Sequence, residues 1–171
     1  MISILLATYN GEKYIAGQIE SLLSQTYKDF KLYICDDKST DDTYSIITDH
    51  ALKNPAKIIA SQNEINAGGA KYNFIKMLME RKADLAMPLG QDDADDYIML
   101  CDQDDVWLPD KIENSLKKIK ENSIIDAVSG NRSFISVDEN NNVNWCCCRD
   151  IRNNACKAQS IYGERVFTCK M

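Results

Sequence analysis

The sequence predicts an α/β fold with a mainly parallel central sheet flanked by helices. Two observations predict it: short apolar runs alternate with stretches of helical periodicity, and polar residues gather where several of the runs end. Strands that alternate with helices form right-handed βαβ units, and such units place their strands in parallel. The chain of 171 residues has the length of about one domain.

The first half of the chain contains three expected strands, each followed by a helix. We expect the strands at residues 2–7, 31–35 and 57–60, because these runs are short, apolar and bounded by turn-forming residues. Asn10 is suited to cap the first helix, and the polar run 39–42 is suited to open the second. The positions that we expect these helices to bury are Ile15, Ile19, Leu22 and Leu23, then Ile46, Ile47 and Ala51, and finally Phe74, Ile75, Leu78 and Met79.

The second half continues the pattern less regularly. A fourth strand is expected at residues 97–101, a helix that begins near 108–110, and a fifth strand at 124–129. Two short runs at 134–137 and 143–145 flank an asparagine-rich turn, which predicts a hairpin.

The composition excludes several classes of protein. The 26 acidic and 20 basic residues give a net charge of −6, which argues against nucleic acid as a partner. No apolar run approaches the ~18 residues of a membrane-spanning helix, and the N-terminus lacks the basic segment of a signal peptide. We therefore expect a cytoplasmic protein with reduced thiols.

The seven cysteines divide between two expected parts of the chain. We expect a first domain at residues 1–130, in which Cys35 and Cys101 end apolar runs and are buried. Residues 131–171 are expected to hold a partial hairpin and an irregular tail. Three adjacent cysteines cannot easily direct their sulfurs at one metal ion, so we expect no structural zinc site there. The cysteines of this second part are Cys146, Cys147, Cys148, Cys156 and Cys169.

Polar residues follow the first, second and fourth expected strands, and a glycine turn follows the third. In open α/β sheets, ligands bind beyond the carboxyl ends of the strands, so we expect a site at this edge. As an alternative, these residues are helix caps and loop acids, which suits Asn10 but explains Asp102 and Asp104 poorly. Carboxylates at one edge repel each other unless a cation or a ligand donor lies among them. The residues are Thr8, Tyr9 and Asn10 after the first strand, Asp36 and Asp37 after the second, Gly68 and Gly69 after the third, and Asp102, Gln103, Asp104 and Asp105 after the fourth.

Asp102 and Asp104 form the strongest metal candidate. Carboxylate oxygens suit Mg²⁺ or Mn²⁺, and such an ion commonly takes phosphate oxygens of a substrate as further ligands. An acidic edge would otherwise repel a phosphate, so the acids predict a pyrophosphate bridged by a metal ion.

Five motifs resemble, in the same order, those of glycosyltransferase family 2. They are ILLATYN at residues 4–10, SQTY at 24–27, DDKSTD at 36–41, Asn66-x-Gly68, and CDQDDVWLPDKI at 101–112. The last motif is similar to the bacterial rhamnosyltransferase-like branch, which builds surface polysaccharide. The resemblance covers residues 1–122 and, loosely, 134–143. Family members usually continue further, so the chain looks truncated.

The resemblance implies a GT-A fold and the inverting transfer of a sugar. The donor would be a nucleoside-diphosphate sugar of the UDP or dTDP type, and the acceptor a polysaccharide or another glycan. Residues 1–130 would bind the donor, and residues 131–171 would form part of the acceptor side. The resemblance also implies Mn²⁺ or Mg²⁺ as cofactor, and peripheral contact with the inner face of the membrane through the acceptor or a further C-terminal region.

The resemblance also implies roles for individual residues. Thr8 and Tyr9 match positions that line the nucleoside pocket, and Asp37 matches the acid that accepts a hydrogen bond from the base. Asp102 matches the first motif acid, near the ribose and the metal, and Asp104 matches the principal metal ligand. The implied donor-binding residues are Thr8, Tyr9, Asn10, Asp36, Asp37, Gly68, Lys71, Asp102 and Gln103, and the implied metal ligands are Asp104 and Asp102, with Asp105 in support.

Two departures from the family affect the expected activity. In the family a Glu-Asp pair supplies the catalytic base, but no such pair occurs in this sequence. We therefore assign no base, and we expect donor binding with little or no transfer. The segment 85–95 looks like an insertion, and its acidic run 92–96 precedes the fourth strand, so we expect a solvated loop there.

Two alternative functions stay open. The first is a nucleotide-sugar-binding remnant without turnover, which an assay for product would distinguish from an enzyme. The second is a nucleotidyltransferase, which would carry a glycine-rich, basic loop after the first strand. Residues 8–12 read TYNGE, which is not such a loop.

Overall fold

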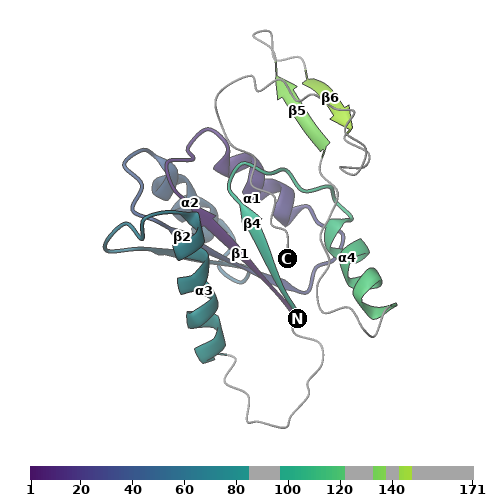
Figure 1. Cartoon of the computed structure of the whole chain (residues 1–171), viewed down its shortest axis with the longest axis horizontal. Helices are drawn as coiled ribbons and strands as arrows, with labels where there is room; N and C mark the ends of the chain where they lie inside the picture. The colour runs from purple at the N-terminus through teal and green to yellow at the C-terminus, as the bar shows by residue number, and fades with distance from the viewer. Residues whose placement is uncertain (85–96, 122–132, 138–142, 148–171) are drawn as a thin grey trace. The chain divides into compact units, whose positions relative to one another are not determined.

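The computed structural model describes residues 1–84, 97–121, 133–137 and 143–147. The chain divides into two compact units, Met1–Asn114 and Ser115–Met171. The predicted domain boundary at residue 130 lies outside the described residues. The first unit contains a parallel sheet in the order β3-β2-β1-β4 (Figure 1). Its strands are β1 (Ile2–Thr8), β2 (Phe30–Asp36), β3 (Ile58–Gln62) and β4 (Tyr97–Asp102).

All four strands lie where the sequence predicts them, and their parallel pairing confirms the predicted sheet. Ala7 of β1 lies opposite Asp102 of β4, and Thr8 lies opposite Asp36 of β2. Because the strands run in the same direction, their carboxyl ends form one edge. The polar residues that follow the strands therefore share that edge, which is where ligands bind in sheets of this kind.

Helices cover both faces of the sheet. Leu5 and Cys35 cluster with Met77 of α3 on one face. Side chains of a strand alternate between faces, so the fully buried Ile4 and Leu6 point to the other face, which α1 and α2 cover (Figure 1). These helices are α1 (Ile15–Leu23), α2 (Thr43–Lys53) and α3 (Ala70–Asp84), and the chain also forms α4 (Lys111–Lys120) after β4.

The buried stripe of α3 differs from the prediction. The sequence predicts that Ile75 and Met79 face the sheet, but their side chains are 43% and 70% exposed. Met77 is buried instead, between the partly buried Phe74 and Leu78. The helix carries apolar residues on several sides, so its periodicity alone does not determine which side faces the sheet.

Asn10 does not cap α1, contrary to the prediction. The N-cap position is Tyr14, and no side chain caps it. Asn10 lies earlier in the loop with φ of 47°, a conformation that asparagine tolerates better than most residues. Its Oδ1 accepts a hydrogen bond from the backbone N–H of Thr40 at 2.9 Å. Asn10 therefore joins the loop after β1 to the loop after β2.

The second unit contains two antiparallel strands, β5 (Ser133–Val137) and β6 (Val143–Cys147). Their pairing confirms the prediction that these two runs pair with each other. Three predicted features lie outside the described residues, namely the strand at 124–129, the acidic run at 92–96 and the tail beyond residue 147.

Candidate functional site

Asp36 ends β2 and is completely buried. Its Oδ1 accepts hydrogen bonds from the hydroxyls of Thr8, at 3.0 Å, and Ser39, at 2.5 Å. Its Oδ2 accepts bonds from the Ser39 backbone N–H and from Nε2 of Gln62, both at 2.9 Å. The carboxylate therefore ties together the ends of β1, β2 and β3, and both of its oxygens are occupied by protein donors.

Asp37 is buried as well, but its two oxygens differ. Oδ1 accepts hydrogen bonds from Nδ2 of Asn63, at 2.7 Å, and from the backbone N–H of Ala67, at 2.6 Å. Oδ2 has no hydrogen-bond partner among the described residues, yet it is not sealed from solvent. Protein contacts thus fix the orientation of the carboxylate and leave Oδ2 without a protein donor among the described residues, although the residue as a whole is only 2% exposed.

Asp37 holds the loop after β3 through hydrogen bonds. Nδ2 of Asn66 donates to the Asp37 carbonyl at 2.8 Å, and Oδ1 of Asn66 accepts from the N–H of Gly68 at 2.8 Å. Gly68 and Gly69 have φ of 89° and 134°, backbone angles that residues other than glycine rarely adopt. The tight turn places the backbone of Gly68 close to Asp37, and the approach of a ligand to this loop stays a prediction.

Sequence reasoning missed three residues that support Asp37. Asn63 and Asn73 are buried, and Nδ2 of Asn63 donates to both Asp37 and Oδ1 of Asn73. Nζ of Lys76 donates to Oδ1 of Asn63. The signal for Asn63 was present, because it follows β3 directly as Asp37 follows β2. The contacts of Asn73 and Lys76 depend on how α3 packs, which no local pattern reveals.

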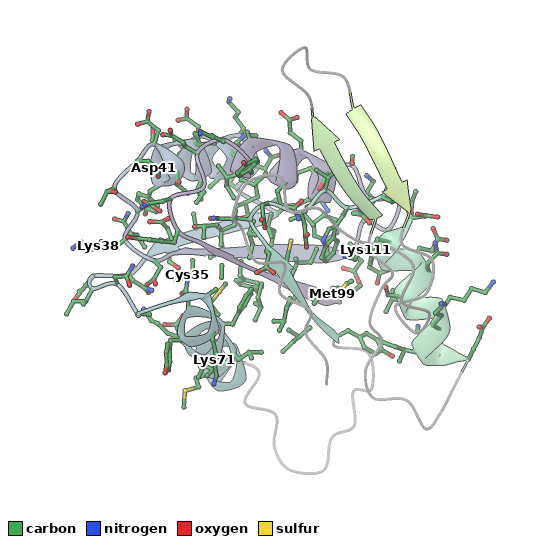
Figure 2. The ribbon with its side chains drawn as sticks, turned by 45° about the horizontal axis from the view of Figure 1, so that its top comes forward. Cys35, Lys38, Asp41, Lys71, Met99 and Lys111 are labelled. Atoms are coloured by element: carbon green, nitrogen blue, oxygen red, sulfur yellow. The ribbon has the colours of Figure 1, made fainter. Side chains whose placement is uncertain are left out.

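Lys71, the predicted phosphate contact, is an exposed residue in the first turn of α3. Figure 2 shows its side chain apart from the loop that carries Lys38 and Asp41. Its assignment to a phosphate stays a prediction.

Two successive backbone groups of the loop after β1 bind the loop after β2 and the start of α2. The backbone N–H of Asn10 donates to Oγ of Ser39 at 2.9 Å, and that of Gly11 donates to Oγ1 of Thr43 at 2.7 Å. Tyr9, by contrast, keeps a side chain that is 47% exposed. An exposed ring on a fixed backbone at this edge suits a wall of the predicted nucleoside pocket.

The acidic turn after β4 carries the predicted metal ligands. Asp102 and Asp105 are partly buried, and Asp104 is exposed. Gln103, which lies between the two motif acids, points its amide at the backbone of Tyr9. Its Oε1 accepts from the Tyr9 N–H at 2.8 Å, and its Nε2 donates to the Tyr9 carbonyl at 3.0 Å. The protein itself therefore uses the Gln103 amide, which the family resemblance assigns to the donor.

Buried polar groups on α1, together with Gln25 just after that helix, contact β4 and the segment that follows the acidic turn. Such groups are costly to bury unless they are paired, so each pair fixes these segments to one another. The bonds run from Gln18 to Sγ of Cys101, at 2.6 Å, from the Trp107 N–H to Ser21, at 3.1 Å, from Gln25 to the Leu108 carbonyl, at 2.8 Å, and from the Ile112 N–H to Gln25, at 3.2 Å.

Cys35 and Cys101 are buried free thiols, as predicted. Burial raises the pKa of both thiols, and it outweighs the hydrogen bond from Gln18, which lowers the pKa of Cys101. Both groups therefore stay protonated and act as packing residues. The thiols of the five later cysteines lie outside the described side chains.

The donor atoms of the acidic turn fit a hard divalent cation. Asp102 and Asp104 supply carboxylate oxygens, the ligand type that Mg²⁺ and Mn²⁺ prefer. No group of three acidic, histidine or cysteine side chains able to hold a metal occurs among the described residues. Two carboxylates can supply only part of a coordination shell, so oxygens of a bound substrate would have to complete it. This is how proteins commonly hold magnesium at a phosphate.

Comparison with known proteins identifies the family. The sequence profile of Glycosyl transferase family 2 matches residues 3–161. The chain belongs to glycosyl transferase family 2. The predicted resemblance is confirmed, and membership decides against the nucleotidyltransferase alternative. It assigns no function to individual residues, so the donor and metal roles proposed for them stay predictions.

Two bacterial relatives of this family 2 chain illustrate the match. The dTDP-rhamnosyl transferase RfbG of Shigella flexneri is 38% identical over 113 residues, which cover 65% of this chain and 35% of RfbG. The UDP-Glc:alpha-D-GlcNAc-diphosphoundecaprenol beta-1,3-glucosyltransferase WfaP of Escherichia coli is 36% identical, over 68% of this chain and 40% of WfaP. The chain thus spans between a third and two fifths of the length of these relatives.

Solved structures confirm the GT-A type of fold. S. aureus TarS 1-349 in complex with UDP-GlcNAc is 27% identical with a TM-score of 0.54, over 70% of this family 2 chain and 31% of TarS. The mannosyltransferase PcManGT from Pyrobaculum calidifontis, in complex with GDP-Man and Mn²⁺, is 18% identical with a TM-score of 0.55, over 69% and 32%, and shares the fold. Within the part of the chain that the structure describes, no helix is long and apolar enough to cross a bilayer.

Proposed function

We propose that this chain binds the donor of a metal-dependent, inverting glycosyltransferase that moves a sugar from a nucleoside diphosphate to a glycan acceptor. One observation carries the proposal: an open carboxylate oxygen on Asp37 and the acidic turn of Asp102 and Asp104 lie at the same edge of the sheet, on either side of β1. Adjacent strands are about 4.8 Å apart, so the two groups are separated by roughly 10 Å. This spacing suits a nucleoside at one end and its phosphates at the other.

Asp37 would recognise the base. Its Oδ2 is positioned to accept a hydrogen bond from an N–H of uracil or thymine, because the contacts from Asn63 and Ala67 hold the other oxygen in place. A hydrogen bond to a carboxylate is worth about 1.5–3 kcal/mol, more than one between neutral groups. The exposed ring of Tyr9 would pack beside the nucleoside.

Asp104 and Asp102 would hold a divalent cation, Mn²⁺ or Mg²⁺, against the donor pyrophosphate. Such an ion acts as a Lewis acid and stabilises the charge that develops on the departing nucleoside diphosphate. The two acids would hold the ion at an edge of the sheet that would otherwise repel the phosphates. PcManGT, which shares the fold, binds Mn²⁺ together with GDP-Man, and this supports the choice of ion.

Transfer also requires a base that deprotonates the acceptor hydroxyl. The sequence contains no Glu-Asp pair of the kind expected for that base. We therefore propose that the chain binds the donor but transfers sugar slowly or not at all, since base catalysis and positioning normally contribute several orders of magnitude in rate. For its location we propose the cytoplasm, supported by the free thiols of Cys35 and Cys101.

Calorimetric titration with UDP tests the binding half of the proposal. We expect Mn²⁺ to raise the affinity of the native chain for UDP by about tenfold or more, and Asp104→Asn to abolish that increase, because an amide keeps the shape but loses the charge. Asp49→Asn, which changes an exposed acid on α2, is the matched control and should keep the increase. An Asp104→Asn variant with an unchanged response to Mn²⁺ would contradict the metal assignment.

An assay of UDP release separates the enzyme from the remnant. Donor binding without release in the presence of glycan acceptors supports the binding remnant. Steady release that depends on the acceptor would show that the chain is a complete transferase and that a base is present.

A further inference from the structure

We propose that Gln103 is a positioning residue that fastens the acidic turn to the backbone of Tyr9 and thereby couples metal binding to nucleotide binding. The inference rests on the proposed function, because it assumes that Asp102 and Asp104 hold the cation. It adds a role for the residue between them, whose side chain faces the protein.

The Gln103 amide makes two hydrogen bonds with one residue, which fixes it at two points. Tyr9 N–H donates to Oε1 at 2.8 Å, and Nε2 donates to the Tyr9 carbonyl at 3.0 Å. β1 and β4 are paired up to Ala7 and Asp102. The Gln103 amide therefore continues the hydrogen bonding between β1 and β4 by one step beyond the ends of the two strands.

Gly11 shows that the contact needs reserved space. A Cβ at Gly11 would lie 2.4 Å from Oε1 and 2.6 Å from Cδ of Gln103, much closer than atoms approach without bonding. The backbone of Gly11 cannot retreat easily, because its N–H donates to Thr43 and its carbonyl accepts from Tyr14 and Ile15. A Cβ at this position would therefore force the Gln103 amide to move away from Tyr9.

The position of Asp104 depends on this anchor. Its side chain is exposed and has no hydrogen-bond or ion-pair partner among the described residues. The backbone of the turn determines where this carboxylate lies, and the Gln103 amide ties that backbone to Tyr9, the residue directly after β1. The Tyr9 end of the same contact lies beside the predicted nucleoside pocket, so one amide spans the two halves of the site.

The first test compares the native chain with Gln103→Ala. In the free protein, the Tyr9 amide proton should exchange with solvent about tenfold faster in the variant, as measured by NMR, because it loses its acceptor. In calorimetry, the increase in UDP affinity caused by Mn²⁺ should fall by about tenfold, which is typical for loss of a group that orients metal ligands. Affinity for UDP without metal should change by less than about threefold, because the acceptor oxygen of Asp37 is untouched.

Three results would overturn the inference. Unchanged exchange at Tyr9 would mean that the contact does not form. Faster exchange with an unchanged response to Mn²⁺ would mean that the contact is structural only. If the native chain itself shows no response to Mn²⁺, the proposed function fails, and the coupling fails with it. Gln103→Asn, whose shorter side chain reaches only one of the two Tyr9 groups, should give an intermediate response to Mn²⁺.

A double-mutant cycle with Gly11 provides the second test. Gly11→Ala alone should reduce the response to Mn²⁺, because the new Cβ displaces the amide of Gln103. In the Gln103→Ala background the same change should have less than about a twofold effect, since the group it displaces is gone. Gly17→Ala is the matched control, because nothing lies within 4 Å of its Cβ position, and it should leave the response unchanged. Effects of Gly11→Ala that are equal in both backgrounds would contradict the inference.

Discussion

The ends of β2 and β4 both carry neighbouring aspartates, but the protein treats them in opposite ways. At the end of β2, Asp36 is surrounded by hydrogen-bond donors and Asp37 uses one of its oxygens for the loop after β3. At the end of β4, Asp104 is exposed, and the turn is held by the amide of Gln103 instead. The difference indicates that carboxylates at one edge can serve either as scaffold or as ligands, depending on whether protein donors already occupy them.

Asp36 has a purely structural role, and replacing it should have the largest effect on stability. We expect Asp36→Ala to lower the free energy of unfolding by about 3 kcal/mol or more, because a completely buried carboxylate is removed and the donors of Thr8, Ser39 and Gln62 lose their acceptor. Denaturant unfolding followed by circular dichroism measures this. Asp49→Ala, which changes an exposed acid on α2, should stay within about 0.5 kcal/mol of the native chain. Similar small losses in both variants would remove the distinction between the two strand ends.

Asp37 combines a structural contact through Oδ1 with the proposed contact to UDP through Oδ2. The substitution Asp37→Asn separates these two roles. The amide oxygen can still accept from Asn63 and Ala67, while an NH₂ group replaces the open Oδ2. We expect UDP binding to weaken by about 1.5–3 kcal/mol, because an acceptor becomes a donor. The midpoint of thermal unfolding should move little. A large drop in that midpoint with unchanged UDP affinity would mean that Asp37 belongs with the scaffold.

Replacing Thr8 tests whether the structural role of Asp36 depends on its contact with β1. Its hydroxyl donates to Asp36, although the family resemblance places it at the nucleoside. We expect Thr8→Val to cost about 1 kcal/mol of unfolding free energy through the lost hydrogen bond. A loss of UDP affinity greater than this loss of stability would place the hydroxyl on the nucleoside instead.

Replacing Asp41 should change the free energy of unfolding least, and the size of this change depends on pH. Partial burial raises the pKa of this carboxyl, but hydrogen bonds from Thr43 and from the Glu12 N–H outweigh it and hold the pKa below its ordinary value of 3.8. A lowered pKa stabilises the fold above the unfolded value, and this stability is lost as the pH falls through the folded pKa. The side chain is largely solvated, so we expect less than about 1 kcal/mol. Asp41→Asn should flatten the fall in stability below about pH 4, where carboxylates normally titrate, and an unchanged acid profile would contradict this.

The sequence predicts the fold well because the strands and helices have clear and different periods. It also predicts that polar residues gather at one edge of the sheet, since such residues follow the strands directly. It does not predict the role of Gln103, because that role depends on a contact with Tyr9, 94 positions away. It also fails for the covered face of α3, where Ile75 and Met77 are both apolar and only packing against the sheet distinguishes them.

The spacing of these contacts along the chain has a consequence for the rate of folding. Thr8 and Asp36 are 28 positions apart, whereas Tyr9 and Gln103 are 94 positions apart. Closing the longer loop costs about 1 kcal/mol more entropy. We therefore expect β1 and β2 to associate first and the acidic turn to be placed late, on the native side of the main barrier. Weakening the Gln103 contact would then speed unfolding and leave the refolding rate nearly unchanged.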